Sequence, residues 1–517
     1  MTGRRRWFIL AVLCVSLLLI SLDMLILNVA LPVIVDSMHA TSSQLQWIVD
    51  AYVVVYAGLL LVLGSIGDRI GRKWVFLAGL LVFAAGSATS AFSATPDRLI
   101  AARAFMGIGG AAIMPSTLSI LTNVFTDPLE RAQAIGIWSG TTGLGLAIGP
   151  MAGGWLLAHF WWGSVFLINV PIALAGFLVA MWVVPNSKAK APKRSDPRGA
   201  ALSIAGMALL LWAIIEAPNR GWGSAWILGA LALAVLLLAA FVLWERRSTH
   251  PMLELSLFSS RRFSAAIGAM GTVIFALMGA LFLLTQYLQF SLGFSPLETG
   301  LRIVPIAAVL LVVAPLSTRI VRTVGTKPVV FTGMVLIGIG LLVLSGVTVR
   351  DTYLQILLPL FLLGIGAGLA FAPCTEAVMG SLPLEQTGIG SATNGTAIQL
   401  GGALGVAVLG SLLNGRYQGR MVPLLAHYRI PSSVLHLVTG SLGGSLAVAK
   451  QVGGALGAEL ARVAREAFVS GMDLALLVGA FATAAAALVV VALLPNRPPP
   501  GPVDDEHEKA GTHSGGD

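Results

Sequence analysis

The sequence has few charged residues and almost no cysteine. Only 11% of its 517 residues are Asp, Glu, Lys or Arg, against about 25% in an average soluble domain. The two cysteines, Cys14 and Cys374, both stand in apolar runs, where a thiol behaves as a small hydrophobe. A disulfide framework and a cysteine-based metal site are therefore excluded. No nucleotide-binding loop or nucleophile constellation is present either, so we expect neither an enzyme nor a cofactor.

Apolar residues are what the chain has in abundance. They make up 56% of the sequence and raise the mean hydropathy to +0.88, so the sequence predicts an all-α integral membrane protein. The net charge is +9, but the basic residues are scattered among the predicted loops. We therefore expect contacts with the lipid bilayer and small hydrophobic substrates, no nucleic acid, and no obligate protein partner.

Fourteen apolar runs are long enough to cross about 30 Å of hydrocarbon. They lie near 7–33, 44–64, 74–94, 97–121, 132–158, 164–184, 199–217, 225–244, 263–288, 298–319, 328–347, 353–378, 388–413 and 468–494. Residues 1–34 start like a signal peptide but lack a small-residue cleavage site, so we interpret them as a retained first span. The sequence predicts a six-helix bundle over 1–187, a linker region with two extra helices over 188–262, and a second six-helix bundle over 263–495.

Lysine and arginine are distributed unequally between the two sets of predicted loops. With the N-terminus inside, the short outer loops hold only Arg98, Arg220 and Arg350, whereas the inner loops hold most of the others. This bias predicts cytosolic termini in the cell membrane. The long extracytoplasmic loop 414–467 escapes the rule because of its length; its stretch near Glu459–Glu466 favours an amphipathic surface helix over a binding site. The polar tail 496–517 is predicted to be disordered and cytosolic.

A charged decapeptide at 64–73 separates the second and third apolar runs. Its pattern is G-x-x-x-D-R-x-G-R-K, made by Gly64, Asp68, Arg69, Gly71, Arg72 and Lys73. We expect a sharply turning cytosolic loop in which glycines provide the turn and Asp68 pairs locally. The alternative, an ordinary short basic loop, explains the full spacing poorly. The decapeptide resembles the cytosolic signature loop of the major facilitator superfamily.

Three ionisable residues fall inside predicted spans of the first bundle. At a rise of about 1.5 Å per residue, Asp23, Asp50 and Arg103 reach one depth in neighbouring helices. A cluster in which the arginine offsets one acid and leaves the other free to titrate meets the requirement for a proton relay. The alternative is a static ion pair that only holds helices together.

A glycine and proline pattern occupies the fifth run. Helices pack closely through glycines four residues apart, and a proline permits a kink. Close packing alone explains Gly145 and Gly149, but it does not explain Pro150 followed by Gly153 and Gly154. The pattern consists of Gly145, Gly149, Pro150, Gly153 and Gly154. It resembles the motif of exporters in the superfamily.

The segments 22–32, 46–52 and 103–110 resemble motifs of the fourteen-span drug:proton antiporters of the EmrB/QacA type. The resemblance covers nearly the whole chain. It implies a major facilitator fold, cation recognition near Asp50 and proton transfer near Arg103.

Five further polar residues are candidates with alternatives left open. Glu376 and Asp473 suit either substrate recruitment or ordinary solvated helix ends. Gln286, Tyr287 and Gln289 either line a cavity or meet interfacial water.

Taken together, these features predict a proton-coupled efflux transporter for hydrophobic, cationic or amphiphilic compounds, driven by a proton gradient. The alternatives are a dedicated exporter of one endogenous metabolite and, more remotely, a membrane sensor that moves nothing. The sequence does not name the substrate, the proton stoichiometry or the oligomeric state.

Overall fold

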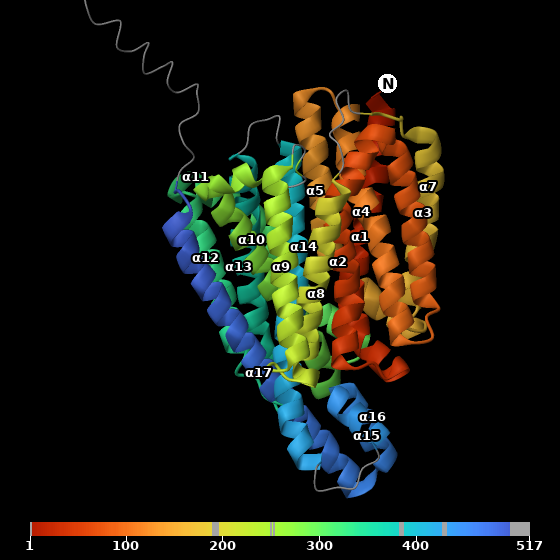
Figure 1. Ribbon diagram of the computed structural model, residues 1–517, viewed down its shortest axis with the longest axis vertical. Helices are drawn as coiled ribbons and strands as arrows, with labels where there is room; N and C mark the ends of the chain where they lie inside the picture. The colour runs from red at the N-terminus through yellow and green to blue at the C-terminus, as the bar shows by residue number, and fades with distance from the viewer. Residues whose placement is uncertain are drawn as a thin grey trace, which may run out of the picture.

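The computed structural model describes residues 3–188, 196–248, 251, 254–381, 387–425 and 432–496. These ranges form a bundle of long, roughly parallel helices (Figure 1). The predicted tail, from residue 497 onward, and much of the basic linker after Lys188 lie outside the described residues.

The first half of the chain forms one bundle. Its helices are α1 (Gly3–Met38), α2 (Ser42–Ile70), α3 (Arg72–Ala91), α4 (Pro96–Val124), α5 (Pro128–His159), α6 (Ser164–Leu167) and α7 (Asn169–Val183). The helices α6 and α7 adjoin and together form one apolar segment, Ser164–Val183. The pairs α2–α4, α3–α4 and α1–α5 have the most extensive contacts of this half.

Two helices then precede the second bundle. They are α8 (Pro197–Arg220) and α9 (Ala225–Arg247), which pack on each other and, through α8, on α2 and α14. The second bundle comprises η1 (Leu255–Ser259), α10 (Arg261–Gln286), η2 (Tyr287–Ser291), α11 (Pro296–Val324), α12 (Thr326–Leu344), α13 (Tyr353–Met379), α14 (Thr387–Leu425), α15 (Ser432–Gly440), α16 (Leu442–Val452) and α17 (Gly454–Leu493).

Within the described residues, twelve helices are long and apolar enough to cross a membrane. A thirteenth is added if the bent pair Ser42–Leu60 and Val62–Ile70, which meets at 47°, is taken as one span. The sequence predicts about fourteen spans, and the count by length and composition does not reach that number; α5, which is 32 residues long, is not among the helices counted.

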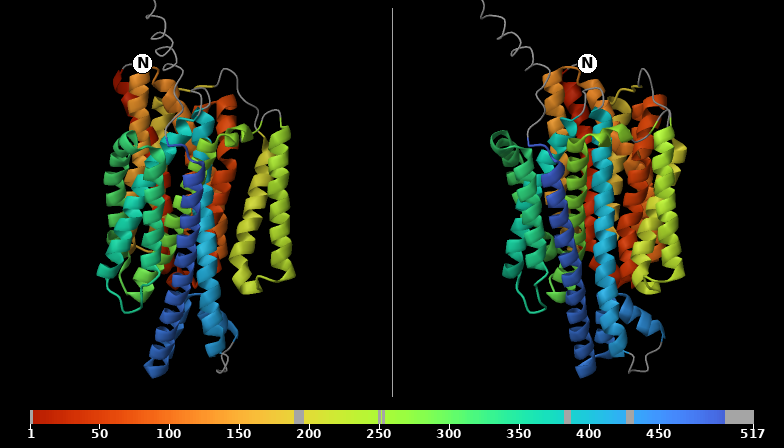
Figure 2. Two further views of the ribbon diagram at one scale, coloured as in Figure 1. Left: turned by 90° about the vertical axis from the view of Figure 1, so that its left-hand side faces the viewer. Right: turned by 60° about the vertical axis from the view of Figure 1, so that its left-hand side comes forward.

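The two ends of the bundle differ in what they carry. Figure 1 places the N-terminus and the end of α17 at one end, and α15 and α16 at the other. We call these the terminal end and the distal end. Figure 2 shows that α8 and α9 stand together at one side of the bundle, running along its length.

The decapeptide 64–73 is mostly helical, which corrects the expectation of a loop. The helix α2 continues to Ile70, and the turn consists of one residue, Gly71, whose φ of 131° suits glycine. Gly64 lies inside α2 and packs against Pro115 of α4. Gly325, with φ 93°, makes the matching one-residue turn between α11 and α12.

The segment 414–467 also differs from the expected loop. The helix α14 extends to Leu425, α17 begins at Gly454, and two short helices lie between them. Tyr417 holds this distal projection together, because its hydroxyl pairs with Ser445 Oγ at 2.6 Å. The predicted surface helix near Glu459–Glu466 is the first part of α17.

Candidate functional site

An ion pair is buried in the middle of the first bundle. Arg103 Nη1 of α4 donates to Asp23 Oδ2 of α1 at 2.6 Å, and both side chains are 1% exposed. The other carboxylate oxygen, Asp23 Oδ1, accepts from Asn169 Nδ2 at the start of α7, at 3.0 Å. Asn169 also donates to Ser87 Oγ at 3.3 Å. Two helices, α4 and α7, therefore each donate one charge-assisted hydrogen bond to the carboxylate of α1.

Arg103 is enclosed by aromatic rings and a backbone carbonyl. Its guanidinium carbon lies 4.5 Å from the centroid of Tyr52 and 5.8 Å from that of Phe166. Arg103 Nε donates to Ile48 O at 3.1 Å. A buried arginine is tolerated where such contacts replace its hydration.

Asp50 lies apart from this pair, which corrects the expectation of a three-residue cluster. Ile48 and Tyr52 of α2 contact Arg103, and Asp50 stands two residues from each, on the opposite side of a helix with 3.6 residues per turn. Asp50 is fully buried, and neither carboxylate oxygen has a hydrogen-bond partner. The amide of Gln46, one turn nearer the distal end, is equally buried and unpartnered.

Three glycines of α5 bring this helix into close contact with α1. A Cβ built on Gly145 would lie 2.5 Å from Ser21 Cβ of α1, and one on Gly149 would lie 2.7 Å from Leu25 Cβ. Gly153 faces Ile26 of the same helix. The motif therefore fits α5 tightly onto α1 along about two turns.

The remaining residues of this motif meet the second bundle. A Cβ on Gly154 would lie 2.5 Å from Leu297 Cα of α11, and one on Gly300 would lie 2.1 Å from Pro150 O. These backbones touch because no side chain separates them. The α5 motif is thus a contact between the two bundles as well as within the first.

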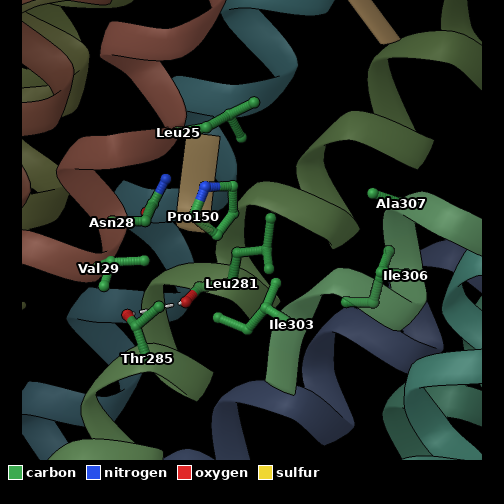
Figure 3. Close-up of a pocket in the computed structure, with 9 residues that line it drawn as sticks. All are labelled: Leu25, Asn28, Val29, Pro150, Leu281, Thr285, Ile303, Ile306 and Ala307. Carbon is green, nitrogen blue, oxygen red and sulfur yellow. Dashed lines mark hydrogen bonds between the residues drawn. The ribbon is translucent and has the colours of Figure 1, made fainter. Parts of the chain in front are cut away.

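A small apolar cavity lies beside Pro150, between the two bundles (Figure 3). It is lined by Leu25, Asn28 and Val29 of α1, Pro150 of α5, Leu281 and Thr285 of α10, and Ile303, Ile306 and Ala307 of α11. Its polar groups bond their own helices: Asn28 Nδ2 donates to Met24 O and Thr285 Oγ1 to Leu281 O. The cavity measures only about 10 Å³, room for one water molecule, so in this conformation it is too small for a drug-sized ligand.

Gln286, Tyr287 and Gln289 are not among the residues that line this cavity. Gln286 donates to Phe282 O of its own helix, and Tyr287 Oη donates to Thr348 O at 2.6 Å. Gln289 Nε2 donates to Val29 O of α1 at 2.9 Å, so it joins the two bundles near the distal end.

The two remaining acids lie far from the ion pair along the chain and on other helices. Glu376 is exposed near the terminal end of α13, within electrostatic range of Arg262. Asp473 is partly buried in α17, within range of Arg420. Neither has a contact with Asp23, Asp50 or Arg103 among the hydrogen bonds and ion pairs described.

The signature residues at the α2–α3 turn bind only partners in the first bundle. Arg72 Nε pairs with Asp68 at 2.7 Å, and Arg72 Nη1 donates to Ser119 O of α4 at 3.2 Å. Lys73 Nζ donates to Met181 O of α7 at 2.6 Å, whereas Arg69 is exposed. In this conformation the turn fastens one bundle together.

Sequence reasoning missed Asn169 and Thr285 as site residues. Both are polar side chains within otherwise apolar helices, and that signal was present in the sequence. The partners of Asn169 depend on tertiary contacts, whereas Thr285 bonds its own helix and is brought to the cavity only by the packing of α10. Within the described residues no group of three or more His, Cys, Asp or Glu side chains is arranged to hold a metal ion.

Comparison with known proteins accounts for this architecture. The model of the Major Facilitator Superfamily matches residues 13–406. The chain belongs to this family. Among solved structures, a bacterial homolog to the human lysosomal transporter Spinster superposes with a TM-score of 0.67 at 16% identity, covering 97% of this chain and 100% of that one. That likeness establishes the fold, and the family and its structural neighbours are transporters.

Relatives in the superfamily are similar over nearly the full length. The multidrug efflux pump LfrA of Mycolicibacterium smegmatis is 35% identical over 493 residues, which is 95% of this chain and 96% of the relative. The tetracenomycin C resistance and export protein of Streptomyces glaucescens is 34% identical over 492 residues, 94% of this chain and 91% of that relative. The methyl viologen resistance protein SmvA of Salmonella typhimurium is 30% identical over 477 residues, which is 91% of this chain and 95% of that relative.

Proposed function

We propose that this member of the superfamily is a proton-coupled multidrug exporter of hydrophobic, cationic or amphiphilic compounds. The observation that carries the proposal is the coexistence of two buried acids with different surroundings. Asp23 is paired with Arg103, whereas Asp50 has no partner. Intramembrane acids are costly and mark ion or substrate pathways. The names of the relatives, which include efflux pumps and resistance proteins, support export as the direction.

The unpartnered carboxylate of Asp50 has a direct chemical use in this scheme. Either a proton or a cationic substrate would neutralise it, so that the two exclude each other at one site. The Asp23–Arg103 pair then acts as the second step, because protonation of Asp23 releases the guanidinium to other partners. When the bundles separate, the apolar side chains that line the small cavity beside Pro150 provide the hydrophobic surface that a lipophilic compound requires.

We further propose fourteen spans in a six plus two plus six arrangement, as in the EmrB/QacA type. Taking α2 as one bent span and adding the 32-residue α5, which packs along α1 and α11, brings the twelve helices to that number. The basic residues near the terminal end support cytosolic termini in the cell membrane.

Transport by the purified protein tests the proposal. In proteoliposomes with an imposed proton gradient, we expect uptake of a lipophilic cationic dye that stops when a protonophore collapses the gradient. Asp50→Asn should abolish uptake of the cation, and Glu459→Gln, whose exposed side chain pairs with Arg462 on its own helix, should retain most of it. Uptake that persists without a gradient would contradict proton coupling. Activity towards one compound from a broad panel of dyes and antibiotics would instead indicate a dedicated exporter.

A further inference from the structure

The helix α8 lies along the seam between the two bundles and packs on one helix of each. Near its terminal end it meets α2, where a Cβ built on Gly58 would lie 2.1 Å from Ile204 Cγ1. Near its distal end it meets α14, where Gly415 packs against Pro218. The helices α2 and α14 also pack on each other, and α8 lies beside both of them (Figure 1). One helix outside the two bundles therefore holds a helix of each.

Pro218 creates an acceptor for α14 on this helix. Proline has no backbone N–H, so the carbonyl of Ile214, four residues earlier, loses its intrahelical donor. Ser411 Oγ of α14 donates to Ile214 O at 2.6 Å, and Ser411 is 1% exposed. This partly buried hydrogen bond replaces the missing one, and breaking it would leave the carbonyl without a protein donor.

Asn219, the next residue, bridges both bundles. Its Nδ2 donates to Ser43 Oγ of α2 at 2.9 Å and also lies 3.3 Å from Glu216 Oε2, while its Oδ1 accepts from Gln418 Nε2 of α14 at 2.7 Å. Ser43 Oγ in turn donates to Ile215 O at 3.4 Å. The distal ends of α2 and α14 are thus joined through the side chain of one residue on α8.

The links to the two bundles are unequal. The link to α14 includes the partly buried bond from Ser411 to a carbonyl with no helical donor. At the distal end, the link to α2 consists of the Asn219–Ser43 bond and the longer bond from Ser43 to Ile215 O. Asn219 is exposed, so water can replace its hydrogen bond to Ser43. Directly beneath this link lies Gln46, whose side chain packs against Gly410 of α14.

We propose that α8 is a strap across the distal seam and that the Asn219–Ser43 hydrogen bond is its releasable link. Alternating access requires the two bundles to separate at one end at a time. When the distal end opens, α8 stays with α14 through Ser411, and Asn219 releases Ser43. The inference rests on the proposed function, because only a transporter needs this alternating opening. It assigns Asn219 as a positioning residue that keeps the distal ends of α2 and α14 together.

Thiol labelling at Gln46 tests this strap without substrate or a proton gradient. The reporter is Gln46→Cys in a background carrying Cys14→Ala and Cys374→Ala, purified in nanodiscs and reacted with a polar maleimide. The test variants are Asn219→Ala and Ser43→Ala. Ser203→Ala is the matched control, since Ser203 lies on the same helix and its hydroxyl bonds only Ala200 O.

We expect Asn219→Ala and Ser43→Ala each to raise the labelling rate about twofold to tenfold, the factor that one hydrogen bond contributes to an equilibrium. The double variant should not exceed Ser43→Ala, because both substitutions remove the Asn219–Ser43 bond and Ser43→Ala also removes the bond to Ile215 O. Asn219 is exposed, so its replacement should not impair folding. An unchanged rate in Asn219→Ala, or an equal rise in Ser203→Ala, would overturn the strap. Since labelling needs no transport, a negative dye-uptake result leaves this test valid.

Discussion

At the scale of residues, burial and pairing give the two acids of the first bundle different roles. Asp23 has a hydrogen bond to each oxygen, from Arg103 and from Asn169, whereas Asp50 has none. Removing the charge of Asp23 leaves a buried guanidinium without its counterion. Removing the charge of Asp50 leaves no other side chain without its counterion, because the Asp50 carboxylate has no partner. A static ion pair is therefore an adequate structural account of Asp23, but it does not account for Asp50.

This difference predicts opposite effects on stability. Asp23→Asn should lower the free energy of unfolding by about 3–5 kcal/mol, the cost of breaking a buried pair from one side. Asp50→Asn should leave stability unchanged or raise it, because it replaces an unpaired buried carboxylate with a neutral amide. Thermal unfolding in detergent measures both. The double variant Asp23→Asn with Arg103→Gln should recover part of the loss; equal destabilisation by the two single variants would contradict the assigned surroundings.

At the scale of elements, α5 and α11 meet through backbone rather than side chains. Pro150, Gly154 and Gly300 bring the two helices into direct contact beside the apolar cavity. Because the backbones of α5 and α11 are in direct contact, a small change in the distance between these two helices should alter how the two bundles move against each other.

Adding one methyl group tests this contact. Gly300→Ala places a Cβ 2.1 Å from Pro150 O, so α11 must shift away from α5. We expect dye uptake to fall at least about tenfold, with a loss of about 1–3 kcal/mol in stability, as overpacking usually costs. Gly229→Ala on α9 is the control, because nothing lies within 4 Å of its Cβ and alanine favours the helix. Full dye uptake by Gly300→Ala would show that transport does not depend on the close contact between α5 and α11.

At the scale of the whole molecule, the two ends have different tasks. The terminal end carries the one-residue turns at Gly71 and Gly325, and the residues around the first of these bind partners within its own bundle. The distal end carries hydrogen bonds between bundles, from Gln289 to Val29 and from Ser42 to Gly440. In this conformation the bundles are therefore joined at the distal end.

The orientation of these ends in the membrane is directly measurable. In a background without Cys14 and Cys374, Lys450→Cys on α16 should react with an impermeant maleimide in intact cells. Lys188→Cys near the terminal end should react only after the cells are permeabilised. Both residues are exposed, so accessibility reports sidedness alone. The reverse pattern would invert the proposed topology.

The sequence by itself determined the helical membrane fold, the family and the position of the α2–α3 turn, because apolar run length and glycine spacing are local properties. It also identified Asp23, Asp50 and Arg103 as candidates, since charges in apolar runs are conspicuous. Depth along a helix follows from counting residues, but the face that a residue presents depends on how its helix is rotated against its neighbours. Only the tertiary structure therefore separated Asp50 from Arg103, brought Asn169 to Asp23, and placed α8 across the seam between α2 and α14.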